Sequence, residues 1–157
     1  CYKDYKNKLI PKIKNPLLSV GTNMIEKLNE KKDFLQVDHV LIENQPALKN
    51  PTMKSIQMIL YSYFLIHGIT RDDRDMKTIE MINARNKLKA YKGPKIQCDI
   101  KETYKRNKYL AIKYTDIMIR ENDKIDKAYH KLYDSSKKKD DLSDAYLQGI
   151  YFIDTLT

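Results

Sequence analysis

The sequence predicts a single α/β domain, because two short apolar segments of strand length alternate with longer segments of helical periodicity. Residues 38–43 and 78–83 are the two strand candidates, and the segments around them repeat apolar residues every three or four positions. The chain has 157 residues, of which 41% are hydrophobic and 32% charged. This length suits one core and is short for two, so residues 1–157 are treated as one domain.

The first half of the chain contains two predicted helices with a strand between them. Apolar spacing after an Asn-Pro pair predicts a helix from about Pro16 to Lys31. The run 38–43 is apolar between polar ends, which favours a buried strand. Asn50 and Pro51 begin a second helical pattern, and we expect Gly68 to end this helix.

The second half begins with the strand 78–83 and continues with predicted helices. A basic turn follows at 85–92, and Gly93-Pro94 breaks the chain. A long amphipathic helix with a basic outer face is predicted from about 101 to 122. Residues 123–139 lose clear periodicity and predict a partly mobile basic loop, and the last helix is expected to start near Asp140.

Positive charge is concentrated in two segments of the chain, whose net charge is +9. Residues 1–32 carry eight Lys against three acids, and residues 85–139 carry seventeen Lys and Arg against seven acids. Residues 33–84 and 140–157 are net negative. A basic surface favours a polyanionic partner such as nucleic acid, because each cation near a phosphate releases condensed counterions. The alternative is a solvated Lys-rich surface that reflects AT-rich coding.

Several site classes are disfavoured by what the sequence lacks. No apolar run approaches the roughly 20 residues of a membrane-spanning helix, and the N-terminus lacks a secretory signal pattern, which predicts an intracellular protein. Cys1 and Cys98 are too few for a disulfide framework, although Cys1 is compatible with a remnant of an upstream zinc-binding insertion. His39, His67 and His130 have no metal-ligand spacing and are interpreted as packing or surface residues.

Carboxylates occur in two places where they suggest chemistry. Glu43 stands at the end of an otherwise apolar strand, where an ionised group is costly unless it is solvated, paired or bound to a cation. Asp141 and Asp144 are three positions apart and share one helix face. Mg²⁺ prefers carboxylate and water oxygens, so the three acids are candidate ligands. The alternative for the Asp pair is a favourable interaction with the helix dipole.

Two blocks of the sequence resemble a known family of nucleases. Residues 42–57 (IENQPALKNPTMKSIQ) and 139–148 (KDDLSDAYLQ) are similar to the Holliday junction resolvases of poxviruses and other large DNA viruses, in the same order along the chain. That family belongs to the RuvC branch of the RNase H-like superfamily. The resemblance extends from about Pro16 to the end. It implies an RNase H-like α/β fold with a mixed central sheet flanked by helices.

The resemblance also implies a site of four carboxylates that hold two Mg²⁺ ions, with Mn²⁺ as a substitute. Glu43 matches the family's strand glutamate, and Asp141 and Asp144 match its two helix aspartates. Asp140 precedes the matched pair and is interpreted as a helix cap or a residue supporting the ligands. The fourth carboxylate belongs to a first strand with a D-x-G motif, which this sequence lacks, so we expect that strand upstream of Cys1.

Basic and aromatic residues near these acids are candidate DNA contacts. The predicted phosphate-binding side chains follow the strand glutamate, follow the second strand, or precede the Asp pair: Lys49, Lys54, Arg85, Lys87, Lys89, Lys137, Lys138 and Lys139. Tyr91 and Tyr104 are candidates for stacking on unpaired bases. For any one of these residues, an ordinary surface or core role is the alternative.

The predicted function is metal-dependent endonuclease cleavage of four-way DNA junctions in recombination and repair. The resemblance implies a homodimer, because a junction needs two symmetric cuts, and, for a viral protein, action at the site of viral DNA replication or in the virion. The alternatives are a non-catalytic, basic nucleic-acid-binding module derived from such a nuclease and a nuclease acting on RNA–DNA hybrids or RNA.

Overall fold

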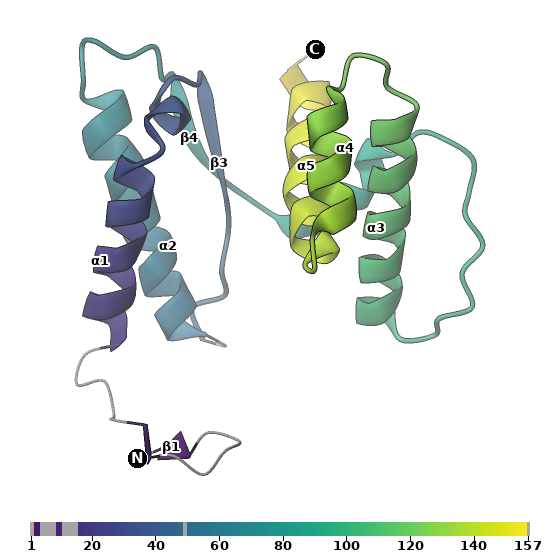
Figure 1. Cartoon of the computed structure of the whole chain (residues 1–157), viewed down its shortest axis with the longest axis horizontal. Helices are drawn as coiled ribbons and strands as arrows, with labels where there is room; N and C mark the ends of the chain where they lie inside the picture. The colour runs from purple at the N-terminus through teal and green to yellow at the C-terminus, as the bar shows by residue number, and fades with distance from the viewer. Residues whose placement is uncertain (1, 4–8, 11–15, 49, 157) are drawn as a thin grey trace. The chain divides into compact units, whose positions relative to one another are not determined.

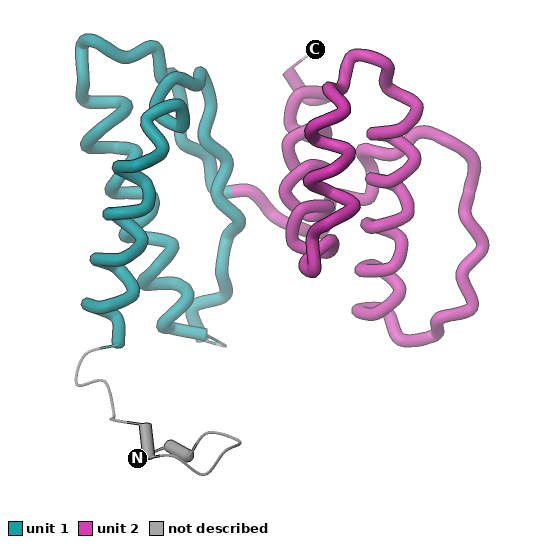
Figure 2. The backbone as a smooth tube through the Cα atoms, in the orientation of Figure 1, with its two compact units in different colours: residues 1–81 teal, residues 82–157 magenta. Residues whose placement is uncertain are grey.

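The computed structural model describes residues 2–3, 9–10, 16–48 and 50–156, and it divides the chain into two compact units, residues 1–81 and 82–157 (Figure 2). The single domain stays a prediction. At the N-terminal end, β1 (Tyr2–Lys3) pairs antiparallel with β2 (Leu9–Ile10). Within the described residues, no helix is long and apolar enough to cross a lipid bilayer.

Unit 1 contains a strand–helix–strand arrangement with a further helix before it (Figure 1). Its elements are α1 (Pro16–Asn29), η1 (Lys32–Leu35), β3 (His39–Glu43), α2 (Pro51–Phe64), η2 (Leu65–Ile69) and β4 (Thr78–Ile82). Strands β3 and β4 form a two-stranded parallel sheet, and α1 packs on α2. The start of the sheet is marked by the Asp38 carbonyl, which accepts hydrogen bonds from the Lys77 and Thr78 amides.

The core of unit 1 follows from the alternation of β3 and the apolar face of α2. Val40 and Ile42 point inward from β3 and are buried, whereas Glu43 at the end of the strand is exposed. Tyr63 and Phe64 at the end of α2 complete this core together with neighbouring apolar residues. Asn50 caps α2 by accepting a hydrogen bond from the Met53 amide at 3.1 Å, as the Asn-Pro pair predicts.

The helical segment that begins at Pro51 ends at Ile69, one residue after Gly68, as predicted, although its last turn is π-helical. After α2 the backbone continues as the π-helical turn η2, which contains Gly68 and ends at Ile69. Gly68 permits close packing, because a Cβ atom there would collide with the side chain of Met76. Met76 is itself buried in the core of unit 1, so the glycine lets this methionine approach the helix backbone.

Unit 2 is helical (Figure 1). Its elements are η3 (Ala84–Ala90), α3 (Thr103–Arg120), α4 (Lys127–Ser135) and α5 (Lys139–Leu156). Helix α5 packs against η3, α3 and α4. The centre of the core is formed by Ala90, Ala111 and Leu147, of which Ala111 and Leu147 are completely buried. The small alanines let the helices approach closely around the leucine.

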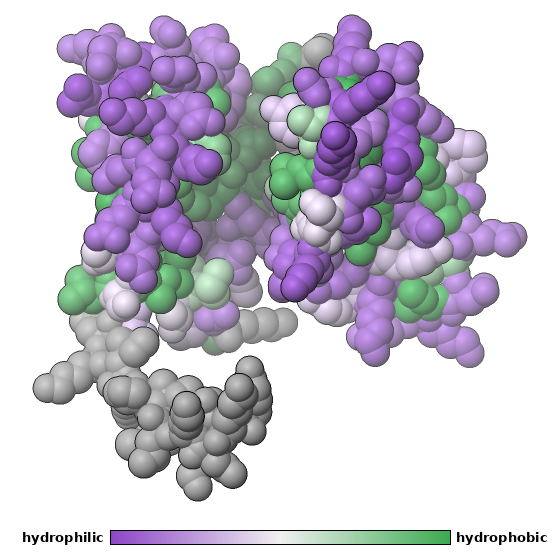
Figure 3. All heavy atoms as spheres, viewed as in Figure 1, coloured by the Kyte–Doolittle hydropathy of each residue, from purple (hydrophilic) through white to green (hydrophobic). Residues whose placement is uncertain are grey.

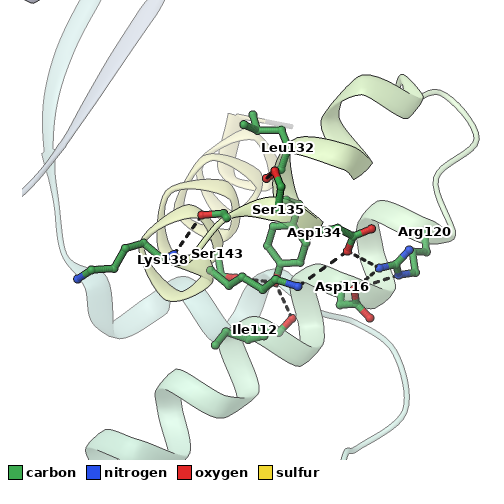
Figure 4. Close-up of polar contacts among 11 residues, drawn as sticks. Ile112, Asp116, Arg120, Leu132, Asp134, Ser135, Lys138 and Ser143 are labelled. Carbon is green, nitrogen blue, oxygen red and sulfur yellow. Dashed lines mark hydrogen bonds and ion pairs between the residues drawn. The ribbon is translucent and has the colours of Figure 1, made fainter.

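Residues 123–139, predicted as a partly mobile loop, instead contain helix α4. Asp126 caps this helix by accepting a hydrogen bond from the Ala128 amide at 2.7 Å. The hydroxyl group of buried Tyr133 donates to the Ile112 carbonyl at 3.0 Å and lies 3.0 Å from the Ser143 hydroxyl (Figure 4). These contacts attach α4 to both α3 and α5, and tertiary packing therefore stabilises a helix of only nine residues, a length that is marginal for a helix alone in water.

The α/β class is confirmed, with a mostly helical composition and a small parallel sheet. The predicted helices at 16–31 and 101–122 and both predicted strands agree with α1, α3, β3 and β4 to within a few residues. The mixed central sheet of an RNase H-like fold stays a prediction. Figure 3 shows mainly hydrophilic residues on the visible face of each unit, with smaller groups of hydrophobic residues among them.

Candidate functional site

Glu43 lies at the end of β3, and the segment that follows it is fixed by a buried glutamine. Gln57 of α2 is only 3% exposed, and its side-chain oxygen accepts a hydrogen bond from the Gln45 amide at 2.9 Å. The Gln45 side chain in turn donates to a Glu43 carboxylate oxygen at 3.4 Å. The exposed Glu43 carboxylate therefore stands at the end of β3, and the segment that follows it is held in place by α2.

Lys54, a predicted phosphate contact, also supports this segment. Its ammonium group donates to the Asn44 side-chain oxygen at 2.9 Å and to that of Gln57 at 3.2 Å. Both partners are neutral amides, so these bonds hold the lysine in place without cancelling its charge. A positive charge thus stands beside the residue that follows Glu43, and DNA binding by Lys54 stays a prediction.

Asp140 in the first turn of α5 is paired with a lysine from α3. The Lys108 ammonium lies 2.6 Å from the Asp140 carboxylate. This hydrogen bond holds the pKa of Asp140 below its ordinary value, and it raises the pKa of Lys108. Asp140 therefore joins α5 to α3, which suits the supporting role predicted for it.

Asp144, one turn further along α5, has one paired and one unpaired carboxylate oxygen. The Lys87 ammonium, from η3, lies 2.5 Å from Asp144 Oδ2, and the two side chains are 13% and 27% exposed, respectively. Asp144 Oδ1 is buried and accepts no hydrogen bond from the part of the chain that the structure describes. A buried carboxylate oxygen without a donor is unfavourable, so this atom is available to a cation or to a proton donor of a ligand.

Asp141 lies on the same side of α5, one turn before Asp144, and is exposed. Its contact with the Lys138 ammonium is 3.7 Å long and involves two exposed side chains, so a ligand can displace it at low cost. The donor set of exposed Asp141 and half-satisfied Asp144 fits a hard divalent cation.

The predicted third ligand, Glu43, belongs to unit 1, whereas the Asp pair belongs to unit 2. Among the described residues of either unit taken alone, no three His, Cys, Asp or Glu side chains are grouped so that they can hold a metal ion. The three predicted ligands therefore do not all belong to one unit, and the meeting of Glu43 with the Asp pair stays a prediction.

The remaining predicted phosphate contacts are Lys49, three residues of η3, two residues just before α5 and the first residue of α5. Lys49 lies outside the described residues. Arg85, Lys89, Lys137 and Lys138 are exposed. Lys139 lies 3.9 Å from the Asp134 carboxylate and 5.2 Å from the centre of the Tyr133 ring. Lys87 and Lys138 are thus next to the candidate ligands, and DNA binding by this group stays a prediction.

The two tyrosines proposed for base stacking differ in their surroundings. The Tyr91 ring is stacked on Tyr114 of α3, with centroids 4.2 Å apart and 11° between the planes, so one face is occupied. Tyr104 is 66% exposed and has the Lys108 ammonium 5.1 Å from its ring centre. Tyr104 is therefore the better placed of the two for contact with an unpaired base.

The histidines at the strands and helices have structural contacts. His39 Nδ1 lies 2.9 Å from the Thr78 hydroxyl group and so links β3 with β4. The His67 ring lies 4.7 Å from the Tyr63 ring. These contacts agree with the packing roles predicted from the sequence.

Two supporting residues were not recognised from the sequence. Gln57 had a signal, because it is a polar residue within the apolar stripe of the predicted second helix. No sequence pattern pointed to Lys108, because its partner Asp140 is 32 positions away and many other lysines also precede Asp140 in the chain.

Comparison with known proteins finds a viral relative without an assigned function. The chain is 39% identical over 160 residues to an uncharacterized protein of Acanthamoeba polyphaga mimivirus. The matched region is 95% of this chain and 37% of that protein, so the chain spans well under half of the relative's length. No family model matches the sequence, and no solved structure matches it. The chain is therefore similar to a giant-virus protein that is itself uncharacterized.

Proposed function

We propose that this chain is part of a metal-dependent endonuclease with an RNase H-like fold that cleaves four-way DNA junctions. The observation that carries the proposal is the state of the α5 acids: Asp144 keeps a buried oxygen to which no described residue donates a hydrogen bond, and exposed Asp141 stands one turn away. An Asp pair that only interacts with a helix dipole has no need for such a buried, unsatisfied oxygen.

The architecture of unit 1 supports the same proposal. Glu43 is the last residue of β3, and β3 pairs in parallel with β4 after a helical connection. Among the described residues, the other edge of β3 pairs with no strand. A strand with the D-x-G motif that pairs there would bring a fourth carboxylate next to Glu43 and cover the open edge.

The chemistry assigned to the side chains is binding and positioning. Glu43, Asp141 and Asp144 would hold the cations, and two bound Mg²⁺ ions would supply water activation and stabilisation of the leaving oxygen. Lys87 balances the charge of Asp144 and would approach a phosphate oxygen brought to the site. Lys138 would exchange its weak contact with Asp141 for a contact with the DNA backbone.

The substrate and assembly of the enzyme form part of the proposal. The net charge of +9 suits a branched DNA that presents several phosphate backbones at once. A four-way junction needs two symmetric cuts, so we propose a homodimer. The similarity to a giant-virus protein suits an enzyme that acts on replicating viral DNA.

The first prediction tests the metal ligands in the full-length protein. Glu43→Gln and Asp144→Asn should each lower Mg²⁺-dependent cleavage of a labelled synthetic four-way junction by at least about 100-fold, because a neutral amide is a poor ligand for a hard cation. Junction affinity, measured by anisotropy in Ca²⁺ or EDTA, should change by less than about threefold.

Glu80→Gln is the matched control, because Glu80 is an exposed acid on the neighbouring strand β4. It should cleave like the wild type. Substantial cleavage by the Glu43 or Asp144 variant, or an equal loss in the Glu80 variant, would reject the site assignment.

The competing function is a basic nucleic-acid-binding module that uses no metal. It is favoured by the Lys87–Asp144 ion pair, in which an ammonium group already occupies one carboxylate oxygen. For this function, junction binding should be tight, unaffected by Mg²⁺ and accompanied by no cleavage. The same junction assay, with and without Mg²⁺, therefore separates the two functions.

A further inference from the structure

A cavity of about 720 Å³ lies in unit 2 between α3 and the irregular segment that joins η3 to α3. Figure 1 shows this segment leaving η3 and returning to the start of α3 as an extended loop. The volume falls within the range of small-molecule sites, which is roughly 300–1,000 Å³. The cavity is separate from the carboxylates of α5, so the proposed nuclease chemistry does not use it.

One part of the cavity wall is cationic. Arg106 of α3 and Lys95 of the loop both line it. Within the described part of the chain, neither side chain forms an ion pair, in contrast to Lys92, Lys105 and Lys108 nearby. These two cations outnumber Asp99, the acid that also lines the cavity, so this wall is suited to an anionic group, and a guanidinium group can bind a phosphate through two parallel hydrogen bonds.

The rest of the wall is suited to a flat ring with polar edges. Tyr114 and Leu110 line the cavity from α3. The Tyr114 ring is held in position by its stack on Tyr91. Asp99, on the loop, adds an acceptor for an amino group. This combination matches the three parts of a nucleotide base site: a phosphate contact, an apolar wall and a polar edge contact.

The backbone of the loop offers further polar groups. Residues 92–101 form no regular secondary structure and, with the other described residues, no backbone–backbone hydrogen bond. Their N–H and C=O groups are therefore available to the edge of a base, whereas a helix or strand would have used them.

We propose that this cavity binds one unpaired nucleotide of a DNA strand, with its phosphate on Arg106 and Lys95 and its base against Tyr114. The inference rests on the proposed function for the identity of the strand, because base pairs at the branch point of an open junction are stacked on one side only and open more readily than pairs inside a duplex. A free nucleoside monophosphate has the same chemistry, and the experiment distinguishes the two sources.

The test compares Arg106→Gln with Arg120→Gln in the full-length protein. Both changes remove one guanidinium group from α3, but Arg120 is paired with Asp116 and Asp134 and lies away from the cavity. Anisotropy with a labelled eight-nucleotide oligo(dC) should show that Arg106→Gln weakens binding at least about tenfold, whereas Arg120→Gln weakens it less than about threefold. Binding of a duplex of the same length should be equal in the two variants.

Lys95→Gln provides a second variant in the exposed loop, where a folding defect is avoided, and it should weaken oligo(dC) binding in the same direction. Equal effects of the Arg106 and Arg120 changes would mean that Arg106 acts only through the general attraction of positive charge to DNA, and this would overturn the proposal. If dCMP competes at the same concentration at which the oligonucleotide binds, the cavity is a site for a free nucleotide. This result would also overturn the proposal.

The pocket and the nuclease can fail separately. A protein that cleaves junctions and whose oligo(dC) affinity is unchanged by Arg106→Gln would reject the pocket alone. A protein that never cleaves but loses oligo(dC) binding in Arg106→Gln would reject the nuclease alone.

Discussion

The ion pair between Lys87 and Asp144 joins η3 to α5 at the candidate metal ligands. Both partners are largely shielded from solvent, and removal of one partner from such a pair leaves an uncompensated charge. The pair therefore has two consequences that can be measured, one for stability and one for cation binding.

The second prediction is that Lys87→Met destabilises the protein by about 1–3 kcal/mol, because Asp144 then loses its charged partner. Mn²⁺ should restore part of this loss, since both carboxylate oxygens become available to the cation. The measurement is thermal unfolding with and without Mn²⁺. Lys89→Met, at an exposed position of the same short helix, is the control and should show neither effect. A Mn²⁺ shift that is equal in wild type and Lys87→Met would contradict the prediction.

The third prediction concerns the pH dependence of the Asp140–Lys108 pair. The pKa of Asp140 is held below its ordinary value of 3.8, so its stabilising effect is complete above that value and is lost as the pH falls through the lower folded pKa. The pKa of Lys108 is raised above 10.5, so its share is complete below that value and is lost as the pH rises through the higher folded pKa. The pair therefore stabilises the fold from about pH 5 to pH 9.

Asp140→Asn should accordingly lower the urea midpoint at pH 7, and the difference from wild type should shrink towards about pH 2. Asp141→Asn is the control, because this exposed residue shares the first turn of α5 and makes only the longer contact with Lys138. A difference that is constant from pH 2 to pH 7, or an equal loss in both variants, would show that the Lys108 bond is not its cause.

For single residues, sequence patterns identified those whose role can be seen from their neighbours in the chain. Glu43 was recognisable because it ends an apolar run, and Asp141 and Asp144 because of their spacing. The partners of these acids were not recognisable, since Lys87 and Lys108 reach α5 from elements 57 and 32 positions away. Such pairings depend on tertiary packing, which no local pattern encodes.

Among the elements, helix α4 depends most clearly on a single side chain. The Tyr133 hydroxyl group is bonded to the Ile112 carbonyl of α3 and to Ser143 of α5. Ser143 is completely buried, so loss of this hydroxyl group leaves polar atoms without partners in the interior.

The fourth prediction is that Tyr133→Phe lowers the free energy of unfolding by about 1–3 kcal/mol, as expected for removal of a buried hydrogen-bonding group. Tyr129→Phe is the control on the same helix, because Tyr129 is 65% exposed, and it should change stability by less than about 0.5 kcal/mol. Chemical denaturation measures both values. Equal stability of the two variants would mean that the hydroxyl contacts do not hold α4.

Local patterns were reliable for elements with long apolar periodicity and unreliable where packing decides. Helices α1 and α3 and strands β3 and β4 agree with their predicted ranges because their apolar stripes are clear. The end of the second helix near Gly68 was also predicted, but its π-helical last turn and the close contact of Gly68 with Met76 were not. Helix α4 was missed because its nine residues are too few for a helical repeat of apolar positions to stand out from the polar sequence around it.

For the whole molecule, the alternation of helices and strands was predictable, but the extent of the sheet was not. The chain forms two compact units, and the described strands of unit 1 pair only with each other. The candidate ligands are divided between these units, and neither periodicity nor spacing in the sequence predicts this division.

The fifth prediction belongs to this scale, because it depends on the charge of the entire chain. With a net charge of +9, binding of a labelled DNA duplex should weaken at least about 100-fold between 50 and 200 mM salt, as counterion release requires when several phosphates are contacted. Fluorescence anisotropy across this range gives the slope of log Kd against log salt. An affinity that hardly changes with salt would exclude phosphate contacts as the main source of binding.

The anchoring of α4 by Tyr133 also determines how the lysines before α5 meet a ligand. Helix α4 ends at Ser135 and α5 begins at Lys139, so a connection of three residues joins two helices that are already held in place. The backbone that carries Lys137 and Lys138 is therefore pre-organised, and an incoming phosphate group would not have to order it. Lengthening this connection with glycines would leave the charge unchanged. Binding of a phosphate group would then have to order the connection, and the affinity for the phosphate would fall.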